Sequence, residues 1–598
     1  MKYDFEQIQH LFELPDEEGR DKTTALGDAI TEFTEPNQYI HFGAAANLPY
    51  GFVYELTRQY WGKNPEFTLS CLGASSNIII PLSSTLFHND KRVVKRIITT
   101  YAGDIYPAPS PSKIMQKIYK EGKITVDNYS LLSMVLRFFA GALNLPFIPI
   151  ETIKNTSIEA ENPGAVKRIQ NPFYENKQEL VLKPLNPDIA YMHGIWADKY
   201  GNTILMPPYT GYMWGVLAAS KIIISVEKIV PTEVIRKYNH LVRIPGHRVS
   251  AVVQIPFGAH PSANRGIAGV DYGYAEDYDF IVKWQKASRY NDQNYSKLKE
   301  WLDEWVLKVD ESSYLDKLGE ERLKFLENKA KPDFWKTRIK DALNESKIDF
   351  SAPSKSTERM TALMAEVGAQ RIKENGYETI LAGQGLSNLA AWLCHKKLLK
   401  QGINVELMAE VGFYGYYPRP GSPFIFEFAN FPTCKSLGGV FNTLGYNIQG
   451  FRSRNIGFLG AGQVDRTGNI NSTKAGKYYL VGSGGAADVC GCSKEVIVCL
   501  KHSALRLLKR VPYITGVGSN INTVITDMGV LEKSNGGLVL THVFKTQDQK
   551  PIEKIIKKIS RSTGWKLESA ENIKIVGHPD PEDLAILRLY DINKNFLR

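Results

Sequence analysis

The sequence has few cysteines and no motif that would pair them. Six Cys occur among 598 residues and none forms a CxxC pair, which excludes a disulfide framework. We therefore expect a reducing, cytoplasmic location. The N-terminal segment is acidic and lacks the apolar centre of a signal peptide. The longest apolar stretch, 131–150, contains Arg137, Asn144 and Pro146, so it predicts a core helix that runs into a strand, and we expect no membrane partner.

Motifs for several common chemistries are also missing. The eleven His form no HExxH or His/Cys set, and Cys490 and Cys492 form a short CxC without further ligands, so we expect no metal. There is no GxSxG elbow, which disfavours an α/β-hydrolase, and no Walker loop. Dense runs of Lys and Arg are absent although the net charge is +10, so the surface suits an anionic ligand and no nucleic acid is expected.

Short strands and helices alternate through most of the chain. In residues 1–280, β-branched runs such as 77–80 and 221–227 alternate with Ala-rich helical stretches. This pattern predicts an α/β protein with mainly parallel sheets and flanking helices. Residues 281–357 are charged, with one apolar stripe around Trp301 that indicates helix packing, and predict a helical extension and linker. The α/β pattern returns over 358–598.

The second half repeats features of the first half in the same order. A strand followed by a Gly-containing turn and a helix occurs twice, as does an Asp-x-x-Gly-Asn turn, and a Ser-Lys pair twice introduces a β-branched strand. The matching segments are 39–43 with 379–383, 197–202 with 464–469, and 220–221 with 493–494. We therefore predict two related open α/β domains in tandem, with a ligand cleft between them.

Two segments of the second half are candidates for chemistry. The Gly-rich run 481–489 follows a strand-like stretch, and its free N–H groups suit an oxyanion or phosphate, although a tight turn without a ligand explains it equally well. Glu410 ends an apolar strand just before Gly412. A carboxylate at this edge of a parallel sheet suits a base, a metal ligand or a covalent nucleophile. For a lone Glu, a surface position at a strand end is the more common outcome.

Taken together, these segments resemble the family I coenzyme A transferases, in particular the glutaconate CoA-transferase branch. In that family the activity is divided between an A-type and a B-type polypeptide, and the two halves of this chain resemble the A type and the B type in that order. The segments that carry the resemblance are 186–202, 218–230 and 244–262 in the first half, and 460–473, 482–488 and 524–531 in the second. The resemblance implies the fold of that family, with A-like and B-like domains fused in one chain.

The resemblance also implies a role for Glu410. In this family a glutamate ahead of a Gly, on a strand-end turn of the B half, is the nucleophile, although Val411 stands where Ser or Asn is more usual. The expected reaction moves coenzyme A from an acyl-CoA to a carboxylic acid by a ping-pong mechanism through a glutamyl-CoA thioester. Coenzyme A is then substrate and covalent intermediate, and no permanently bound cofactor is expected. Some relatives with this fold lack the glutamate and act as decarboxylases, so its presence favours transfer.

Further site residues are implied by the same resemblance. The backbone of Gly484 and Gly485 is the expected oxyanion donor, and Ser130 is expected to complete the oxyanion hole, with a helix N-cap as its alternative role. Gln463 and Asp465 belong to the matching motif but could simply hold a turn together. The residues expected to bind substrate or coenzyme A are Gly43, Ala44, Gly383, Gln384, Gly385, Gln463, Gly482 and Ser483.

The substrates and the assembly are predicted only by class. The glutaconate branch suggests a short dicarboxylate or an unsaturated or 3-oxo acid, and its two polypeptides form dimers of heterodimers, which makes the fused chain a candidate homodimer. Two alternatives stay open. One is an acyl-CoA hydrolase or decarboxylase on the same fold, and the other is a non-catalytic acyl-CoA-binding protein.

Overall fold

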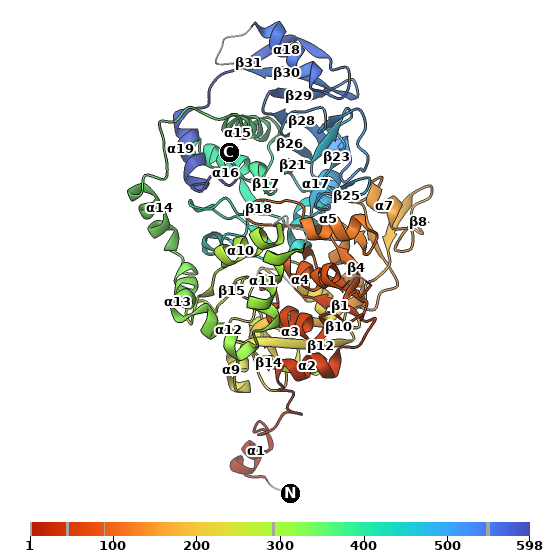
Figure 1. The fold of residues 1–598 in the computed structure, drawn as a ribbon, viewed down its shortest axis with the longest axis vertical. Coiled ribbons are helices and arrows are strands. Elements are labelled where there is room, and N and C mark those ends of the chain that lie inside the picture. Colours follow the sequence, from red (N-terminus) through yellow and green to blue (C-terminus); the bar gives the residue numbers. More distant parts are fainter. Residues whose placement is uncertain (1–2, 44–46, 89, 290–293, 546–550) are drawn as a thin grey trace.

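Two α/β units lie one above the other along the long axis of the molecule (Figure 1). The computed structural model describes residues 3–43, 47–88, 90–289, 294–545 and 551–598. The first half, red to yellow, forms the lower unit, and the second half, cyan to blue, forms the upper unit.

The first unit is built on a parallel sheet. Its parallel strands run in the order β14-β12-β10-β1-β2-β4-β6, and the antiparallel strands β11 and β13 extend it beside β10. The central strands are continuous apolar runs because helices and loops cover both faces, as Ile222, Ile223 and Ile224 show by being fully buried. The bounds are β1 Tyr39–Phe42, β2 Phe67–Ser70, β4 Val94–Thr99, β6 Thr125–Asn128, β10 Ile189–Ala197, β11 Thr203–Ile204, β12 Lys221–Ile229, β13 Val242–Ile244 and β14 Ala251–Gln254.

The second unit repeats the core of the first. The order β14-β12-β10-β1-β2 recurs as β28-β26-β21-β17-β18, again with every pair parallel. These strands are β17 Thr379–Ala382, β18 Glu406–Ala409, β21 Asn455–Gly460, β26 Glu495–Leu500 and β28 Ile521–Thr526. Beyond β28 the sheet continues through β29 (Gly529–Ser534), β30 (Gly537–Phe544) and β31 (Ser569–Val576), at the top of Figure 1. The prediction of two related, mainly parallel α/β domains in tandem is confirmed.

The repeated Asp-x-x-Gly-Asn turns have the same hydrogen bonds. Asp198 Oδ1 accepts from the N–H groups of Tyr200 and Asn202, at 3.1 and 2.9 Å. Asp465 Oδ1 accepts from the N–H groups of Thr467 and Asn469, at 3.0 and 3.1 Å. The resemblance between the halves therefore extends from strand order to individual turns.

One sequence prediction of a strand is wrong. The β-branched run 77–80 lies in helix α4 (Ser76–Phe87), where both faces of the run are buried. A short apolar run that is buried all round has no amphipathic period, so its sequence does not distinguish a core helix from a core strand.

The stretch of chain that connects the two sheets is helical, and much of it lies on the left side of Figure 1. Trp301 is 6% exposed and packs against the rings of Phe280 and Trp284, which confirms helix packing for the apolar stripe. The helices are α10 (Tyr278–Arg289), α11 (Ser296–Leu302), α12 (Glu311–Leu318), α13 (Glu320–Lys329) and α14 (Phe334–Asn344), and α15 (Ser356–Asn375) then opens the second unit. The proposed domain boundaries at 280 and 357 stay predictions.

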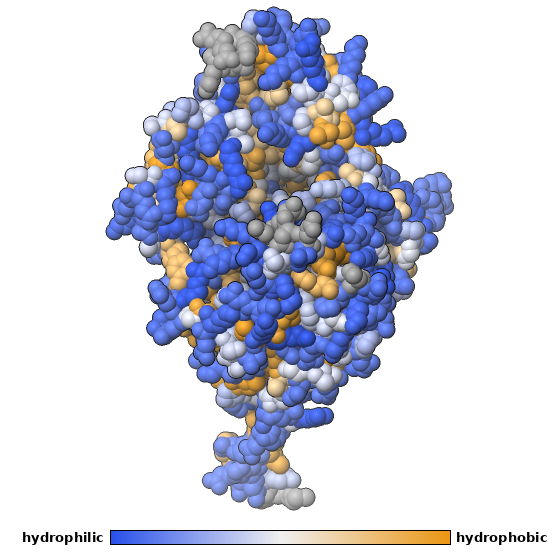
Figure 2. Space-filling view, viewed as in Figure 1, coloured by the Kyte–Doolittle hydropathy of each residue, from blue (hydrophilic) through white to orange (hydrophobic). Residues whose placement is uncertain are grey.

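The surface of the molecule is mainly hydrophilic on the face drawn in Figure 2, where apolar side chains form small separate patches. In the part of the chain that the structure describes, no helix combines the length and the apolar character needed to cross a membrane.

Candidate active site

Glu410 lies at the carboxyl end of strand β18. The strand before it is buried, so the chain leaves the sheet at Glu410 and turns sharply. Gly412 makes the turn possible, because its φ of 119° favours glycine and a Cβ there would lie 2.6 Å from the backbone of Gly438. The Thr443 hydroxyl donates to the carbonyl of Glu410 at 2.6 Å and fixes the turn from the other side. The nucleophile predicted from the sequence therefore stands on a rigid strand end.

The Gly-rich turn 482–485 lies directly against the Glu410 carboxylate. Gly485 is the N-cap of helix α17 (Ala486–Cys492), and a methyl group on Gly485 would collide with Oε2 of Glu410. A backbone hydrogen bond from Gly485 lowers the pKa of Glu410, against the larger effect of burial. Only glycine at this position allows the backbone to approach the carboxylate so closely.

The other N–H groups of the turn are engaged elsewhere. The Gly484 N–H donates to the Thr100 carbonyl at 2.9 Å, and the Ser483 N–H donates to Oδ1 of Asn128 at 3.3 Å. The Gly482 N–H donates to the Ser472 carbonyl at 3.1 Å. Of the two glycines expected to share the role of oxyanion donor, Gly484 therefore uses its N–H to hold the two halves together.

The Ser130 hydroxyl does not face the cavity around Glu410. Ser130 is fully buried at the N-cap of helix α6 (Leu131–Ala142), where its Oγ accepts from the Ser133 N–H at 3.2 Å. The same hydroxyl donates to Oδ1 of Asp488 at 2.6 Å. These contacts favour the N-cap alternative over a direct place in an oxyanion hole.

Asp488, which our sequence analysis did not single out, connects the two halves beside Glu410. Besides Ser130, its carboxylate accepts from the Thr152 hydroxyl at 2.6 Å and from the Leu132 N–H at 3.0 Å. All three donors belong to the first half, whereas Asp488 belongs to the first turn of α17 in the second half. The one signal in the sequence is an acidic residue directly after the run Gly-Gly-Ala-Ala.

The electrostatics of the site are those of two buried acids. Burial raises the pKa of Glu410 to about 7, and the charge of Asp488 adds to that rise. Burial also raises the pKa of Asp488 to about 6, against the opposite effect of its three hydrogen bonds. A carboxylate with so high a pKa, aimed at a cavity, is typical of a functional site.

Glu410 opens into a cavity of about 130 Å³ between the two halves. Of the residues predicted from the sequence, Glu410, Gln384 and Gly484 line it. The rest of the described lining comes from both halves. These residues are Leu48, Leu72, Gly73, Thr100, Tyr101, Ile105, Leu131, Pro208, Thr210, Val411, Phe426 and Phe431.

The remaining predicted residues lie around this cavity or away from it. Gly383 follows β17 and donates to the Phe458 carbonyl at 2.9 Å, and Gly385 is the N-cap of helix α16 (Leu386–Lys400), so both flank Gln384. Gly43 follows β1 and donates to the Tyr191 carbonyl at 2.9 Å, while Ala44 lies outside the described residues.

Gln463 holds a turn in the second half. Its amide donates to the Leu505 carbonyl at 3.0 Å and accepts from Asn471 at 2.8 Å. These contacts favour the turn-holding alternative for the motif that contains Gln463 and Asp465. Within the described residues, no group of three His, Cys, Asp or Glu is placed to hold a metal ion.

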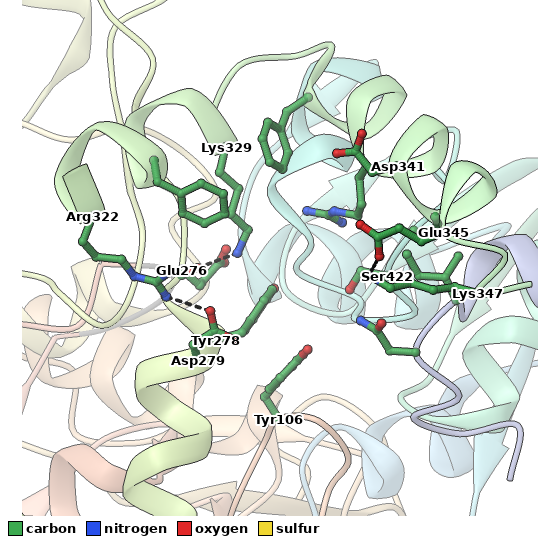
Figure 3. A pocket seen from close by; sticks show the side chains of 17 residues that line it. Tyr106, Glu276, Tyr278, Asp279, Arg322, Lys329, Asp341, Glu345, Lys347 and Ser422 are labelled. Atoms are coloured by element: carbon green, nitrogen blue, oxygen red, sulfur yellow. Dashed lines mark hydrogen bonds and ion pairs between the residues drawn. The ribbon is translucent and has the colours of Figure 1, made fainter.

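A second, larger cavity of about 340 Å³ lies where the helical segment meets the second half. Figure 3 shows Lys329 pointing toward Glu276, whose carbonyl it contacts at 2.5 Å, with Nζ also 3.9 Å from the centre of the Tyr278 ring. Beside it, Arg338 pairs with the buried Glu427 at 2.8 Å. The Arg338–Glu427 pair attaches α14 to the second half, whereas Lys329 attaches α13 to residues 276–278.

Comparisons with known proteins show the family of the chain. Residues 23–254 match the family model for coenzyme A transferases. The A chain of glutaconate CoA-transferase from Acidaminococcus fermentans is 28% identical over 327 residues, which cover 50% of this chain and 93% of that protein. The B chain of 3-oxoadipate CoA-transferase from Pseudomonas knackmussii is 32% identical over 254 residues, 38% of this chain and 90% of that protein.

A solved structure shares the fold over nearly the whole length. An acyl-CoA transferase of Escherichia coli O157:H7 superimposes with a TM-score of 0.63 at 15% identity and covers 96% of this chain and 97% of its own. The similarity to relatives of both the A type and the B type is consistent with two such polypeptides fused in one. The chain therefore belongs to the coenzyme A transferase family and is an enzyme of the CoA-transferase type.

Proposed function

We propose that this enzyme transfers coenzyme A between carboxylic acids by a ping-pong mechanism through a glutamyl-CoA thioester on Glu410. The observation that carries the proposal is the contact between the Glu410 carboxylate and the Gly485 backbone, in a cavity between the two halves. A carboxylate held on a strand end and hydrogen-bonded by a backbone N–H is suited to nucleophilic attack on a thioester.

In the first step, one oxygen of the Glu410 carboxylate attacks the carbonyl carbon of the acyl-CoA. A C–O bond forms, the C–S bond breaks, and coenzyme A leaves as a thiolate. The product is a mixed anhydride of the acyl group and Glu410. Because an anhydride and a thioester have similar transfer potential, the step needs no ATP and no redox partner.

In the second step, the thiolate attacks the glutamyl carbonyl of the anhydride. The new C–S bond gives the glutamyl-CoA thioester, and the donor acid leaves as its carboxylate. The oxyanion of this step is an oxygen of Glu410 itself, which is the group that Gly485 contacts before the reaction begins. Gly485 is therefore the proposed oxyanion donor, and the acceptor acid then reverses both steps.

The pKa of Glu410 suits this chemistry. A value of about 7 leaves a large ionised fraction near neutral pH and makes the carboxylate more basic than an ordinary glutamate. Burial of Glu410 in an apolar cavity also strengthens its hydrogen bond to the backbone. The turn Gly383-Gln384-Gly385 is our proposed contact for coenzyme A, since Gln384 lines the same cavity.

The test is intact-mass analysis after incubation with a panel of acyl-CoAs and no acceptor acid. We expect a covalent coenzyme A adduct on the peptide that contains Glu410, and no adduct in the Glu410→Ala variant. Consumption of acyl-CoA to free acid without an adduct would replace transfer by hydrolysis. A decarboxylated thioester would likewise indicate decarboxylation, and binding without turnover would leave an acyl-CoA-binding protein.

A cytoplasmic location and a homodimer stay part of this proposal. Light scattering on the purified chain measures the oligomeric state directly, and a mass of one chain would contradict the dimer.

A further inference from the structure

We infer that the acyl site takes a short monocarboxylic acid with an uncharged tail and rejects dicarboxylates. The inference rests on the proposed function, because it assigns the cavity around Glu410 to the acyl group. Glu410 is the single charged side chain among the described residues that line this cavity. A dicarboxylate would bring a second negative charge into a space where these residues offer no cation.

The walls of the cavity are apolar on both sides. The first half contributes Leu48, Leu72, Ile105 and Leu131, and the second half contributes Val411, Phe426 and Phe431. Leu72 and Phe431 are 5% and 3% exposed, so both side chains belong to packed cores. Apolar walls stabilise an apolar acyl tail and leave a buried carboxylate without hydration.

The polar groups of the lining are largely committed to the protein. The Thr100 hydroxyl donates to the Leu72 carbonyl at 2.7 Å, and the Tyr101 hydroxyl donates to the Asp104 carbonyl at 2.5 Å. The amide of Gln384 donates to the Ile105 carbonyl at 3.4 Å. These groups therefore have carbonyl partners of their own, and all of them are neutral.

A basic side chain, Arg265, contacts the wall from behind. The guanidinium of Arg265 is 5.1 Å from the centre of the Phe431 ring, and Nη1 donates to the Pro207 carbonyl. Phe431 lines the cavity, whereas Arg265 does not. The positive charge is therefore used for stacking and for holding the loop at Pro207.

Electrostatics inside the cavity add to the discrimination. A distal carboxylate would lie in the same poorly solvated space as Glu410, whose pKa is already raised by burial and by the charge of the nearby Asp488. Three acids without a cation repel one another. A dicarboxylate would therefore have to bind with its distal carboxyl group protonated, or with that group turned out into solvent.

The size of the cavity limits the tail. Its volume of about 130 Å³ is well below the roughly 300 Å³ at which cavities for larger organic ligands begin. A straight or branched acid of a few carbons fits this space. The inference therefore disfavours the dicarboxylate that the family resemblance suggested, and an unsaturated or 3-oxo monocarboxylic acid is compatible with it.

The experiment compares acyl-CoAs of equal chain length that differ only at the far end. Butyryl-CoA is paired with succinyl-CoA and pentanoyl-CoA with glutaryl-CoA, and the rate of adduct formation on Glu410 is measured for each. We expect kcat/KM to favour the methyl-terminated member of each pair by about 100-fold or more. Equal rates, or a preference for the dicarboxylic donors, would overturn the inference and leave the proposed function intact. Absence of an adduct with every donor would overturn the proposed function and this inference together.

A matched pair of variants tests the wall itself. Leu48 lines the cavity and is partly exposed, so we expect a longer polar side chain to be tolerated there. Leu48→Arg supplies a cation, and Leu48→Gln supplies a polar group without charge. We expect Leu48→Arg to reduce the preference for pentanoyl-CoA over glutaryl-CoA at least 10-fold relative to Leu48→Gln. The same preference in both variants would contradict the assignment of this wall to the acyl tail.

Discussion

At the scale of single residues, the site depends on two acids that burial keeps partly protonated. Glu410 carries the reaction in our proposal, whereas Asp488 bonds three donors of the first half and acts on Glu410 through its charge. Asp488 is thus a positioning residue. Replacing either acid should change the pH dependence of the enzyme in a direction that the structure fixes.

Asp488→Asn should move the pH profile of adduct formation to lower pH. Glu410 attacks as a carboxylate, so in the wild-type enzyme the rate should rise with pH through an apparent pKa near 7 and then level off. Removing the charge of Asp488 removes one of the two causes that raise the pKa of Glu410, while burial still keeps it above 4.5. Single-turnover rates from pH 5 to pH 9 measure the shift, and thermal unfolding checks that the variant is folded. An unchanged profile in a folded variant would contradict the coupling.

Glu410→Gln should stabilise the protein at alkaline pH. The folded-state pKa of about 7 lies above the unfolded value near 4.5, so the folded state binds more protons between these pH values. Stability contributed by the protonated Glu410 is therefore present below pH 4.5 and is lost as the pH rises through 7. We expect the variant to gain roughly 3 kcal/mol over the wild type at pH 8 and little at pH 4.5.

Denaturant unfolding at the two pH values measures this difference. The control is Glu553→Gln, an exposed position on helix α18 (Ile552–Arg561), where the gain should be small at both pH values. A stabilisation of Glu410→Gln that does not grow with pH would show that burial of the carboxylate has no cost.

The sequence identified Glu410 and left its environment open. The position of a carboxylate at a strand end before a Gly is a local feature, and the family resemblance gave it a role. Its raised pKa depends on Asp488 and on side chains of the other half, which no local pattern brings together. Ser130 shows the same limit, because its hydroxyl is used by a helix start and by an acid in the opposite domain.

At the scale of elements, the Gly-rich turn and helix α17 bring the backbone to the nucleophile. Adjacent glycines of this turn have different tasks. Gly485 contacts the Glu410 carboxylate, whereas Gly484 has a φ of 51° and open space where a Cβ would lie. The two positions therefore give a matched pair of substitutions.

Gly485→Ala should reduce the rate of adduct formation at least 100-fold, because its methyl group collides with Oε2 of Glu410 and displaces the oxyanion donor. Gly484→Ala should lower the melting temperature, since alanine adopts positive φ at a cost of about 1 kcal/mol, and its loss of activity should be much smaller. Single-turnover kinetics and calorimetry on both variants test the pair. Equal losses of activity would show that the turn as a whole matters, and that the donor at Gly485 does not.

Helices and strands could be told apart from the sequence where a hydrophobic period or a turn signal was present. The β-branched run that forms β12 begins at Lys221 and lies between helical stretches of the sequence, so these neighbouring stretches predicted a strand. The run 77–80 lacks such a signal and became a helix. The half-to-half contacts through 100–102 and 481–484 depend on tertiary structure and have no sequence pattern.

At the scale of the whole molecule, duplication explains why the cavity lies where it does. The two five-strand cores have the same strand order. The strand registers make Leu72, which lies after β2, the structural equivalent of Glu410, which lies after β18. Both residues line the cavity. The repeated unit thus supplies two equivalent strand ends, of which one carries the nucleophile and the other an apolar wall.

We expect the enzyme to remain active when its chain is divided into two polypeptides. Residues 346 and 347 are exposed in the linker after α14, and a break between Lys347 and Ile348 cuts no element. The halves are held by other contacts: the buried pair of Arg338 and Glu427, and the bonds from Asp488 to Ser130 and Thr152. Residues 1–347 and 348–598 expressed together should therefore co-purify and form the Glu410 adduct at a rate within a few fold of the single chain. Arg338→Ala should weaken the complex of fragments far more than it destabilises the single chain, because it leaves Glu427 buried without its ion-pair partner. Wild-type fragments that fail to associate would show that the linker itself is needed to assemble the site.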